Sequence, residues 1–364
     1  MAFTLTDYRR RQTNLKRRLA RQDLDYAVTT DAAHLRYLVG YTGSNGLLLL
    51  GNGTPEFYTD GRYREQARRQ VRGARVNVVR GGDLLVELSR YRGFSGGRPK
   101  IGYEPHLLNE RSAQRMRESA KKALFVPMDN ILEPLMQVKD ASEISCIKKA
   151  AAIADTAFEH ALTVIRPGVR ERDVAAELEY RMTRSGSERV AFETIVASGP
   201  RSALPHGLAS DRKITSGDFV TLDFGATVDG YVSDITRTVV VGRATPRQKR
   251  VHALVRRAHQ RAITRARAGI RCSALDRAAR NLIARAGFGN RFDHGLGHGI
   301  GLIIHEGPGI NPRNEAVLKT GMVVTIEPGV YFPGWGGVRI EDDVLIRPRG
   351  CTVITQSPRE LIEL

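Results

Sequence analysis

The stretch DHGLGHGIGLIIHE, residues 293–306, most constrains how this chain folds, because it combines three histidines with four glycines. Each of these glycines would destabilise a helix interior by about 1 kcal/mol. The stretch therefore predicts a strand or loop in which glycine lets the backbone and a ligand approach closely. The alternative is a tight turn whose histidines only cap and fill space. Potential ligands elsewhere in the chain decide between the two interpretations.

The composition is that of an ordinary globular protein, with 364 residues of which 41% are hydrophobic and 26% charged. This length predicts two domains, or one large domain with an appendage. The sequence contains no apolar run of membrane-spanning length and no signal peptide, so we expect no membrane partner. Three cysteines, Cys146, Cys272 and Cys351, lie far apart, which favours a reducing, cytoplasmic location.

The net charge of +18 arises from 57 basic and 39 acidic residues. Such an excess is typical of chains that attract nucleic acid or anionic membranes. Here the basic residues are scattered along the chain, without zinc-finger spacing, an RRM signature or a basic region followed by heptads. We therefore expect a solvated, arginine-rich surface rather than a nucleic-acid partner.

The hydrophobic pattern predicts an α/β (α+β) protein with a smaller N-terminal domain, residues 1–138, and a larger C-terminal domain, residues 139–364. In the first domain, strands such as DYAVTT and GLLLLGNG alternate with helical stretches such as TDGRYREQARRQV and DLLVELSRY. In the second domain, a pair of helices followed by strands occurs twice, which is consistent with an internal duplication of an α/β unit.

Two acidic residues occur in FVTLDFGATVDGYVSDITRTVVV, residues 219–241, which predicts a hairpin with Asp229-Gly230 in its turn. A four-residue loop would pair Asp223 with Asp234 and bring their Cβ atoms to roughly 4.5–5.5 Å on one face. Carboxylates that close repel each other unless a proton or a cation lies between them. With a slipped register, one aspartate would instead be solvated at the hairpin end.

A second stretch, residues 321–346, repeats this scheme. Glu327 ends the apolar strand MVVTI, and Glu341 follows in a strand that returns beside the first after a turn rich in glycine and proline. Arg339 lies two residues before Glu341 and shares its face. Asp342 and Asp343 are expected to be the exposed members of this acidic cluster.

Four acids and one imidazole, His298, form a hard, oxygen-rich donor set. Such a set suits a pair of divalent ions, most readily Mn²⁺, with Co²⁺ or Zn²⁺ as alternatives. Two metals can share a bridging hydroxide and clamp both ends of a hydrolytic displacement. The residues thus predict that His298 is the nitrogen ligand of a two-metal centre, in which the glycines make room.

The segments TLDFGA, SDITRT, HGLGHGIGLIIHE, TIEPG and RIED occur in this order, and with them the chain resembles the pita-bread metallopeptidases, in particular the Xaa-Pro peptidases prolidase and aminopeptidase P. The resemblance covers most of residues 142–364 and implies a pita-bread (creatinase/aminopeptidase-like) catalytic domain. YTGSNG and TDGRY are more loosely similar to the smaller, creatinase-like N-terminal domain of these peptidases. The resemblance further implies a homodimer.

The resemblance also implies roles for individual residues. The metal ligands are Asp223, Asp234, His298, Glu327 and Glu341, of which Asp234 and Glu341 contact both metals. His206 and His294 border the substrate pocket, and His305 hydrogen-bonds the substrate carbonyl or the tetrahedral intermediate. Arg339 steadies the acids on the metal side. The alternative for each histidine is that it only orients its neighbours.

The implied substrate is a small peptide with proline at its second position. The bridging hydroxide attacks the carbonyl before proline, and Glu327 transfers the proton to the leaving proline nitrogen. Arg313 lies fourteen residues before Glu327, where similar prolidases carry an arginine that holds the dipeptide carboxylate; this favours a dipeptidase. The alternatives are an aminopeptidase P acting on longer peptides, a methionine aminopeptidase, and a binding module that has lost its metals.

Overall fold

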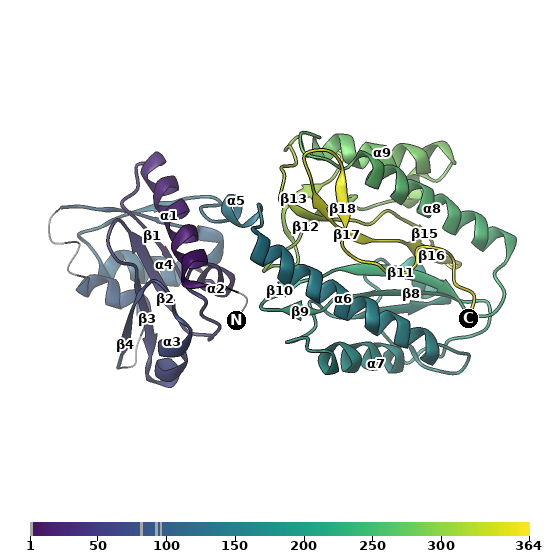
Figure 1. Cartoon of the computed structure of the whole chain (residues 1–364), viewed down its shortest axis with the longest axis horizontal. Helices are drawn as coiled ribbons and strands as arrows, with labels where there is room; N and C mark the ends of the chain where they lie inside the picture. Colours follow the sequence, from purple (N-terminus) through teal and green to yellow (C-terminus); the bar gives the residue numbers. More distant parts are fainter. Residues whose placement is uncertain (1–2, 81–82, 92–93, 95–96) are drawn as a thin grey trace. The chain divides into compact units, whose positions relative to one another are not determined.

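The computed structural model describes residues 3–80, 83–91, 94 and 97–364. The chain divides into two compact units, Met1–Met136 and Gln137–Leu364. Each unit contains its own sheets and its own hydrophobic core (Figure 1). Among the described residues, no helix is both long enough and apolar enough to cross a bilayer.

The N-terminal unit is built on one mixed sheet of six strands in the order β4-β3-β2-β1-β5-β6. The strands are β1 (Tyr26–Thr29), β2 (Leu47–Gly51), β3 (Glu56–Asp60), β4 (Arg75–Val79), β5 (Lys100–Tyr103) and β6 (Leu124–Pro127). The α-helices are α1 (Leu5–Arg21), α2 (Ala32–Val39), α3 (Arg64–Gln70), α4 (Glu110–Ser119) and α5 (Glu133–Met136), and the short 3-10 helices are η1 (Gly61–Tyr63) and η4 (Pro105–Leu107).

The stretch DLLVELSRY, for which the sequence predicts an ordinary helical segment, forms the 3-10 helix η2 (Leu84–Arg90). The Asp83 side chain caps it by accepting a hydrogen bond from the Leu85 N–H. Leu85 and Leu88 are both buried, and their three-residue spacing matches the period of a 3-10 helix.

The C-terminal unit contains two helix pairs and several short sheets. The helices are α6 (Ala141–Val164), α7 (Glu171–Arg184), α8 (Pro246–Arg265) and α9 (Cys272–Arg285), with the 3-10 helices η5 (Gly199–Ala203) and η6 (Gly289–Arg291). The strands of the first half are β7 (Ile195–Ser198), β8 (Phe219–Phe224), β9 (Thr227–Val228), β10 (Tyr231–Val232) and β11 (Ile235–Val240). Those of the second half are β12 (Gly297–Gly299), β13 (Glu306–Ile310), β14 (Val323–Ile326), β15 (Gly329–Phe332), β16 (Gly336–Arg339), β17 (Asp342–Ile346) and β18 (Cys351–Val353).

Helix α6 begins at a capping box, in which Asp140 accepts from the Glu143 N–H and the Glu143 carboxylate accepts from the Asp140 N–H. It ends at Val164, three residues before Pro167 of the Pro167-Gly168 pair. Its small buried residues recur every three or four positions, so that one face packs closely on a sheet: Ala150, Ala154, Ala157 and Ala161.

The two helix pairs cover the sheets of the C-terminal unit. Helices α6 and α7 share a core with the three-stranded sheet β11-β8-β7, whereas α8 and α9 share a core with the five-stranded sheet β13-β12-β14-β17-β18. Figure 1 shows the strands lying between the two helix pairs. The order of two helices followed by strands thus occurs in both halves, and the strands meet in the middle of the unit.

Candidate metal centre

Asp223 and Asp234 lie on one face of the hairpin formed by β8 to β11. The turn contains only Asp229 and Gly230, both at positive φ (47° and 79°), as a two-residue type I′ turn requires. Asp223 therefore pairs with Thr236, and the predicted direct pairing with Asp234 is wrong. Because the register differs by two residues, an even number, Asp234 stays on the same face as Asp223.

Glu327 and Glu341 lie opposite each other on the second hairpin. Ile326 pairs with Asp342 in β14-β17, and Gly329 pairs with Arg339 in β15-β16, so the intervening glutamates face each other across the ribbon. The predicted return of the second strand beside the first is confirmed.

The two hairpins are joined directly at the candidate site. The Glu341 N–H donates to the Thr236 carbonyl at 3.1 Å. The Thr236 hydroxyl in turn donates to Glu341 Oε2 at 2.5 Å. This contact holds the carboxylates of both hairpins next to each other.

His298 lies at the centre of the short strand β12, so the predicted strand or loop is confirmed. A Cβ on Gly297 would come within 2.1 Å of the Thr325 carbonyl oxygen, and one on Gly299 within 2.3 Å of the Gly307 carbonyl oxygen. Only glycine allows the neighbouring strands to approach this closely. The glycines thus allow β12 to lie close to its neighbours, which places His298 in the same cavity as the four acids.

The four acids and His298 line a single cavity of about 510 Å³. The His298 Nε2 atom lies 3.6 Å from Asp234 Oδ2 and 3.6 Å from Glu327 Oε1. One ligand atom each from Asp234, His298 and Glu341 all lie within 4.8 Å of one another. Such a cluster is suited to hold a cation.

Burial and mutual repulsion raise the pKa values of Asp234, Glu327 and Glu341. The pKa of Asp234 lies well above its usual range because of burial and the charge of Glu341, and that of Glu341 is raised by burial and by Glu327. Burial likewise raises the pKa of Glu327 to about 7. In the opposite direction, burial lowers the pKa values of His294 and His298 to about 4, so both rings are neutral near pH 7.

The donor set fits divalent cations. Among the described residues, the buried Oδ1 atoms of Asp223 and Asp234 have no hydrogen-bond partner in the protein. Arg339 forms an ion pair with Asp223 at 2.6 Å, which leaves most of the negative charge of the four acids uncompensated. Buried carboxylates without partners are strongly unfavourable unless a cation neutralises them. Oxygen donors with one neutral imidazole match hard or borderline metals.

The tautomer of His298 also suits a ligand. Its Nδ1 lies 3.1 Å from the Gly299 carbonyl oxygen, which only accepts, so Nδ1 carries the proton. The Nε2 lone pair therefore points toward the acids. A backbone carbonyl that fixes the ring in this way is a common second partner of a metal-binding histidine.

Tyr331, which was not among the predicted site residues, connects two of them. Its hydroxyl accepts from Arg339 Nη1 at 2.9 Å and lies 2.9 Å from His294 Nε2. His294 Nδ1 lies 2.8 Å from the Gly295 carbonyl oxygen and carries the proton, so Nε2 accepts from the tyrosine hydroxyl. No sequence signal marks Tyr331, because it lies in an otherwise apolar strand.

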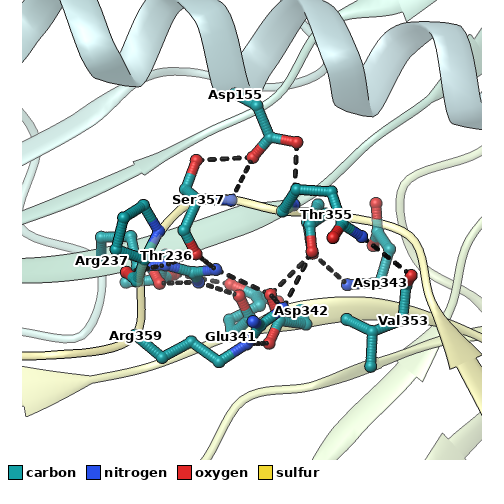
Figure 2. Close-up of polar contacts among 12 residues, drawn as sticks. Asp155, Thr236, Arg237, Glu341, Asp342, Asp343, Val353, Thr355, Ser357 and Arg359 are labelled. Atoms are coloured by element: carbon teal, nitrogen blue, oxygen red, sulfur yellow. Dashed lines mark hydrogen bonds and ion pairs between the residues drawn. The ribbon is translucent and has the colours of Figure 1, made fainter.

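Asp342 and Asp343 are fully buried, so the prediction that they are exposed is wrong. Figure 2 shows Asp342 within a polar network that also includes Glu341, where Asp342 accepts from Arg237 at 2.7 Å and also from Arg359. Arg237 additionally donates to the Glu341 carbonyl. The side chain of Asp343 accepts from the Asp234 N–H at 3.0 Å. Both aspartates therefore hold the backbone of predicted ligands instead of facing solvent.

The remaining predicted residues divide into two groups. His206 and His305 are exposed and line the cavity, and the His305 ring centroid lies 4.5 Å from that of His298. Arg313 is exposed and is not among the described residues that line the cavity. Its N–H donates to the side chain of Asn311, which does line it. The structure thus brings the histidines to the acids but leaves Arg313 near the edge.

Known proteins match both units. Residues 145–348 match metallopeptidase family M24, and residues 11–136 match the creatinase/prolidase N-terminal domain. The Xaa-Pro dipeptidase of Pyrococcus horikoshii is 47% identical over 249 residues, which cover 68% of this chain and 71% of that protein.

Solved structures are similar over almost the whole chain. An Xaa-Pro dipeptidase from Bacillus anthracis matches with a TM-score of 0.94 and 42% identity, over 98% of this chain and 100% of that one. An X-Pro aminopeptidase from Thermotoga maritima matches with a TM-score of 0.90 and 37% identity, over 97% of this chain and 99% of that one.

Proposed function

The chain belongs to metallopeptidase family M24, and on that premise we propose that it hydrolyses the bond between an N-terminal residue and the proline that follows, preferring dipeptides. The observation that carries the proposal is the convergence of four carboxylates and one neutral imidazole in a single cavity. The similarity to Xaa-Pro dipeptidases supports the choice of substrate.

We assign the metal ligands to Asp223, Asp234, His298, Glu327 and Glu341, which would hold two divalent ions, with Mn²⁺ preferred over Co²⁺ or Zn²⁺. Divalent ions supply Lewis acidity and lower the pKa of water, so that hydroxide is available near neutral pH. Elemental analysis after purification with each metal tests this assignment. Two equivalents per chain are expected, and activity with each metal identifies the preferred one.

Glu327 is the proposed general base and acid. Its side chain lines the same cavity as the other proposed ligands, and its Oε1 atom lies 3.6 Å from His298 Nε2, which places a carboxylate beside the attacking water. Its carboxylate accepts the proton of the attacking water and passes it to the proline nitrogen as that nitrogen leaves.

The three histidines of the cavity other than His298 have proposed roles toward the substrate. Both ring nitrogens of His294 are engaged, by the Gly295 carbonyl and the Tyr331 hydroxyl, so His294 shapes the wall of the pocket. His206 and His305 are exposed at the cavity and are the candidates to donate to the substrate carbonyl. This arrangement suits a tertiary amide, because the Xaa-Pro bond offers a carbonyl but no N–H.

The length of the substrate is tested with Ala-Pro and Ala-Pro-Ala. We propose that Arg313 holds the carboxylate of the dipeptide, so Arg313→Ala should raise KM for Ala-Pro by about tenfold, the effect of losing one charge-assisted hydrogen bond. Hydrolysis of Ala-Pro-Ala should change little. Arg349→Ala, at another exposed arginine, is the matched control and should leave both reactions unchanged.

Two results would contradict the proposal. Faster cleavage of Ala-Pro-Ala than of Ala-Pro would favour the aminopeptidase function, which the similarity to the X-Pro aminopeptidase supports. Cleavage of neither peptide by protein carrying two metals would exclude both functions.

We further propose a homodimer, which light scattering of the purified protein tests directly.

A further inference from the structure

A second candidate site lies on helices α8 and α9, outside the metal centre. Residues 246–285 contain twelve arginine and lysine residues but a single acid, Asp276, so this short stretch accounts for +11 of the net charge of +18. Asp276 is fully buried and forms an ion pair with Arg280 at 2.7 Å. The exposed faces of these helices therefore carry only positive charge. Basic residues are concentrated in this stretch, so the statement that they are scattered along the chain is wrong here.

These two helices border a groove of about 790 Å³. Its charged lining consists of arginines only: Arg257, Arg261, Arg265, Arg267, Arg277 and Arg285. Its apolar lining comes mainly from aliphatic residues such as Leu254, Ile270 and Leu282. The groove shares no lining residue with the metal cavity, so its ligand would not compete with the peptide substrate.

Arginines next to the groove have acidic partners, whereas three of the arginines that line it on α8 have none in the residues that the structure describes. Arg256, one position away from the groove arginine Arg257, forms an ion pair with Glu360 at 2.9 Å, and Arg271 pairs with Glu315 at 2.8 Å. Within the described part of the chain, Arg257, Arg261 and Arg265 have no acidic partner. Like charges four residues apart destabilise a helix, so this row is unfavourable unless an anion neutralises it.

The spacing of the arginines indicates an elongated ligand. Arg257 and Arg265 on α8 are eight residues apart, as are Arg277 and Arg285 on α9. At 1.5 Å per residue, each helix spreads its positive charge over about 12 Å of the groove. A single phosphate would reach only part of this length, whereas a chain of phosphates would contact guanidinium groups along both sides.

We propose that the groove binds linear inorganic polyphosphate. Guanidinium groups bind phosphate oxygens through paired hydrogen bonds, and the chain of charges matches the rows of arginines. Among its described lining residues none is aromatic, so nucleobases would find no ring on which to stack. This favours a ligand that consists of phosphates alone over single-stranded nucleic acid.

The test is a titration of the full-length, metal-loaded protein with medium-chain sodium polyphosphate, at salt concentrations from about 50 to 200 mM. The triple variant R257E/R261E/R265E should bind at least about tenfold more weakly at the lowest salt. Each lost phosphate contact should also reduce the slope of log K against log salt by about 0.7, or about 2 for the three together.

The matched control carries three charge reversals on exposed arginines of the N-terminal unit, R64E/R69E/R111E. It has the same net charge as the groove variant and should bind polyphosphate almost as tightly as the wild type. Hydrolysis of Ala-Pro should be unchanged in both variants, which shows that they are folded.

Three outcomes would overturn the proposal. The first is no saturable binding of polyphosphate, and the second is equal weakening in the groove and control variants. The third is that a single-stranded oligonucleotide or poly-glutamate of matched charge binds the groove at least as tightly as polyphosphate. Because the titration is independent of peptide hydrolysis, failure here would leave the proposed peptidase function untouched.

Discussion

The ion pair between Lys139 and Glu306 offers a direct test of how the cavity wall is held. The Lys139 Nζ atom lies 2.8 Å from Glu306 Oε2, and the two side chains are only 1% and 3% exposed. The other carboxylate oxygen of Glu306 accepts from the N–H groups of Leu302 and Ile303 at 2.9 and 3.3 Å. The pair thus fixes the loop that leads to His305, the residue directly before Glu306.

Removing one partner should be strongly destabilising. Lys139→Met keeps most of the side-chain volume but leaves the Glu306 carboxylate buried without its cation, which should lower the free energy of unfolding by about 3–5 kcal/mol. Glu306→Gln keeps one oxygen for the two N–H groups but places an amide against the ammonium, with a similar expected loss. The double variant K139M/E306Q contains neither charge and should regain at least about 2 kcal/mol relative to the sum of the single losses.

Urea unfolding followed by tryptophan fluorescence measures these differences. The chain has a single tryptophan, the half-buried Trp335, whose ring packs against Phe219 and Phe332 of the C-terminal core, so its emission reports on that unit. A loss below about 1 kcal/mol for Lys139→Met, together with additive single effects, would show that the pair is effectively solvated and would refute this reasoning.

Three further predictions concern the metal centre and the core. Asp234→Asn should abolish the rise in melting temperature that Mn²⁺ gives the wild type. It should not destabilise the protein without metal, because burial and Glu341 already raise the pKa of Asp234. Thermal unfolding with and without Mn²⁺ tests this, and an undiminished metal response would contradict it. Tyr331→Phe removes the hydroxyl between His294 and Arg339 and should lower kcat/KM by about tenfold at unchanged metal content; unaltered kinetics would assign Tyr331 a packing role only. Burial lowers the pKa of His252 to about 4, so the unfolded chain binds a proton below pH 6.5 that the folded chain does not. Through this residue the protein should lose about 3 kcal/mol of stability as the pH falls from 6.5 to 4, and His252→Gln should remove that share of the pH dependence in urea unfolding at a series of pH values.

The convergence of the acids and His298 could be predicted from local patterns. A strand alternates its side chains between two faces, so acids within apolar strands share a buried face. Buried acids need polar or cationic partners, and the histidine among glycines was a candidate for the same site. The exact pairing was not needed, because Asp223 and Asp234 remain on one face when the register changes by two residues.

The surroundings of the site were not predictable in this way. Asp342 is buried because Arg237, 105 residues earlier in the chain, and Arg359 donate to it. Tyr331 matters through contacts with Arg339 and His294 that arise only when separate segments come together. Such partners are set by tertiary packing, and the alternation of polar and apolar residues within one strand carries no information about them.

The order in which the site residues leave the ribosome follows from the pairing of the two hairpins. The first carboxylates emerge at residues 223 and 234, but β14 cannot pair with β17 until residues 342–346 have been synthesised. During translation the early acids therefore have neither their imidazole nor the opposite glutamates, and they cannot form a complete cation site. If the proposed centre holds metal, its uptake should consequently be one of the last events in the biogenesis of this protein, and a chain released before β17 should bind no metal there.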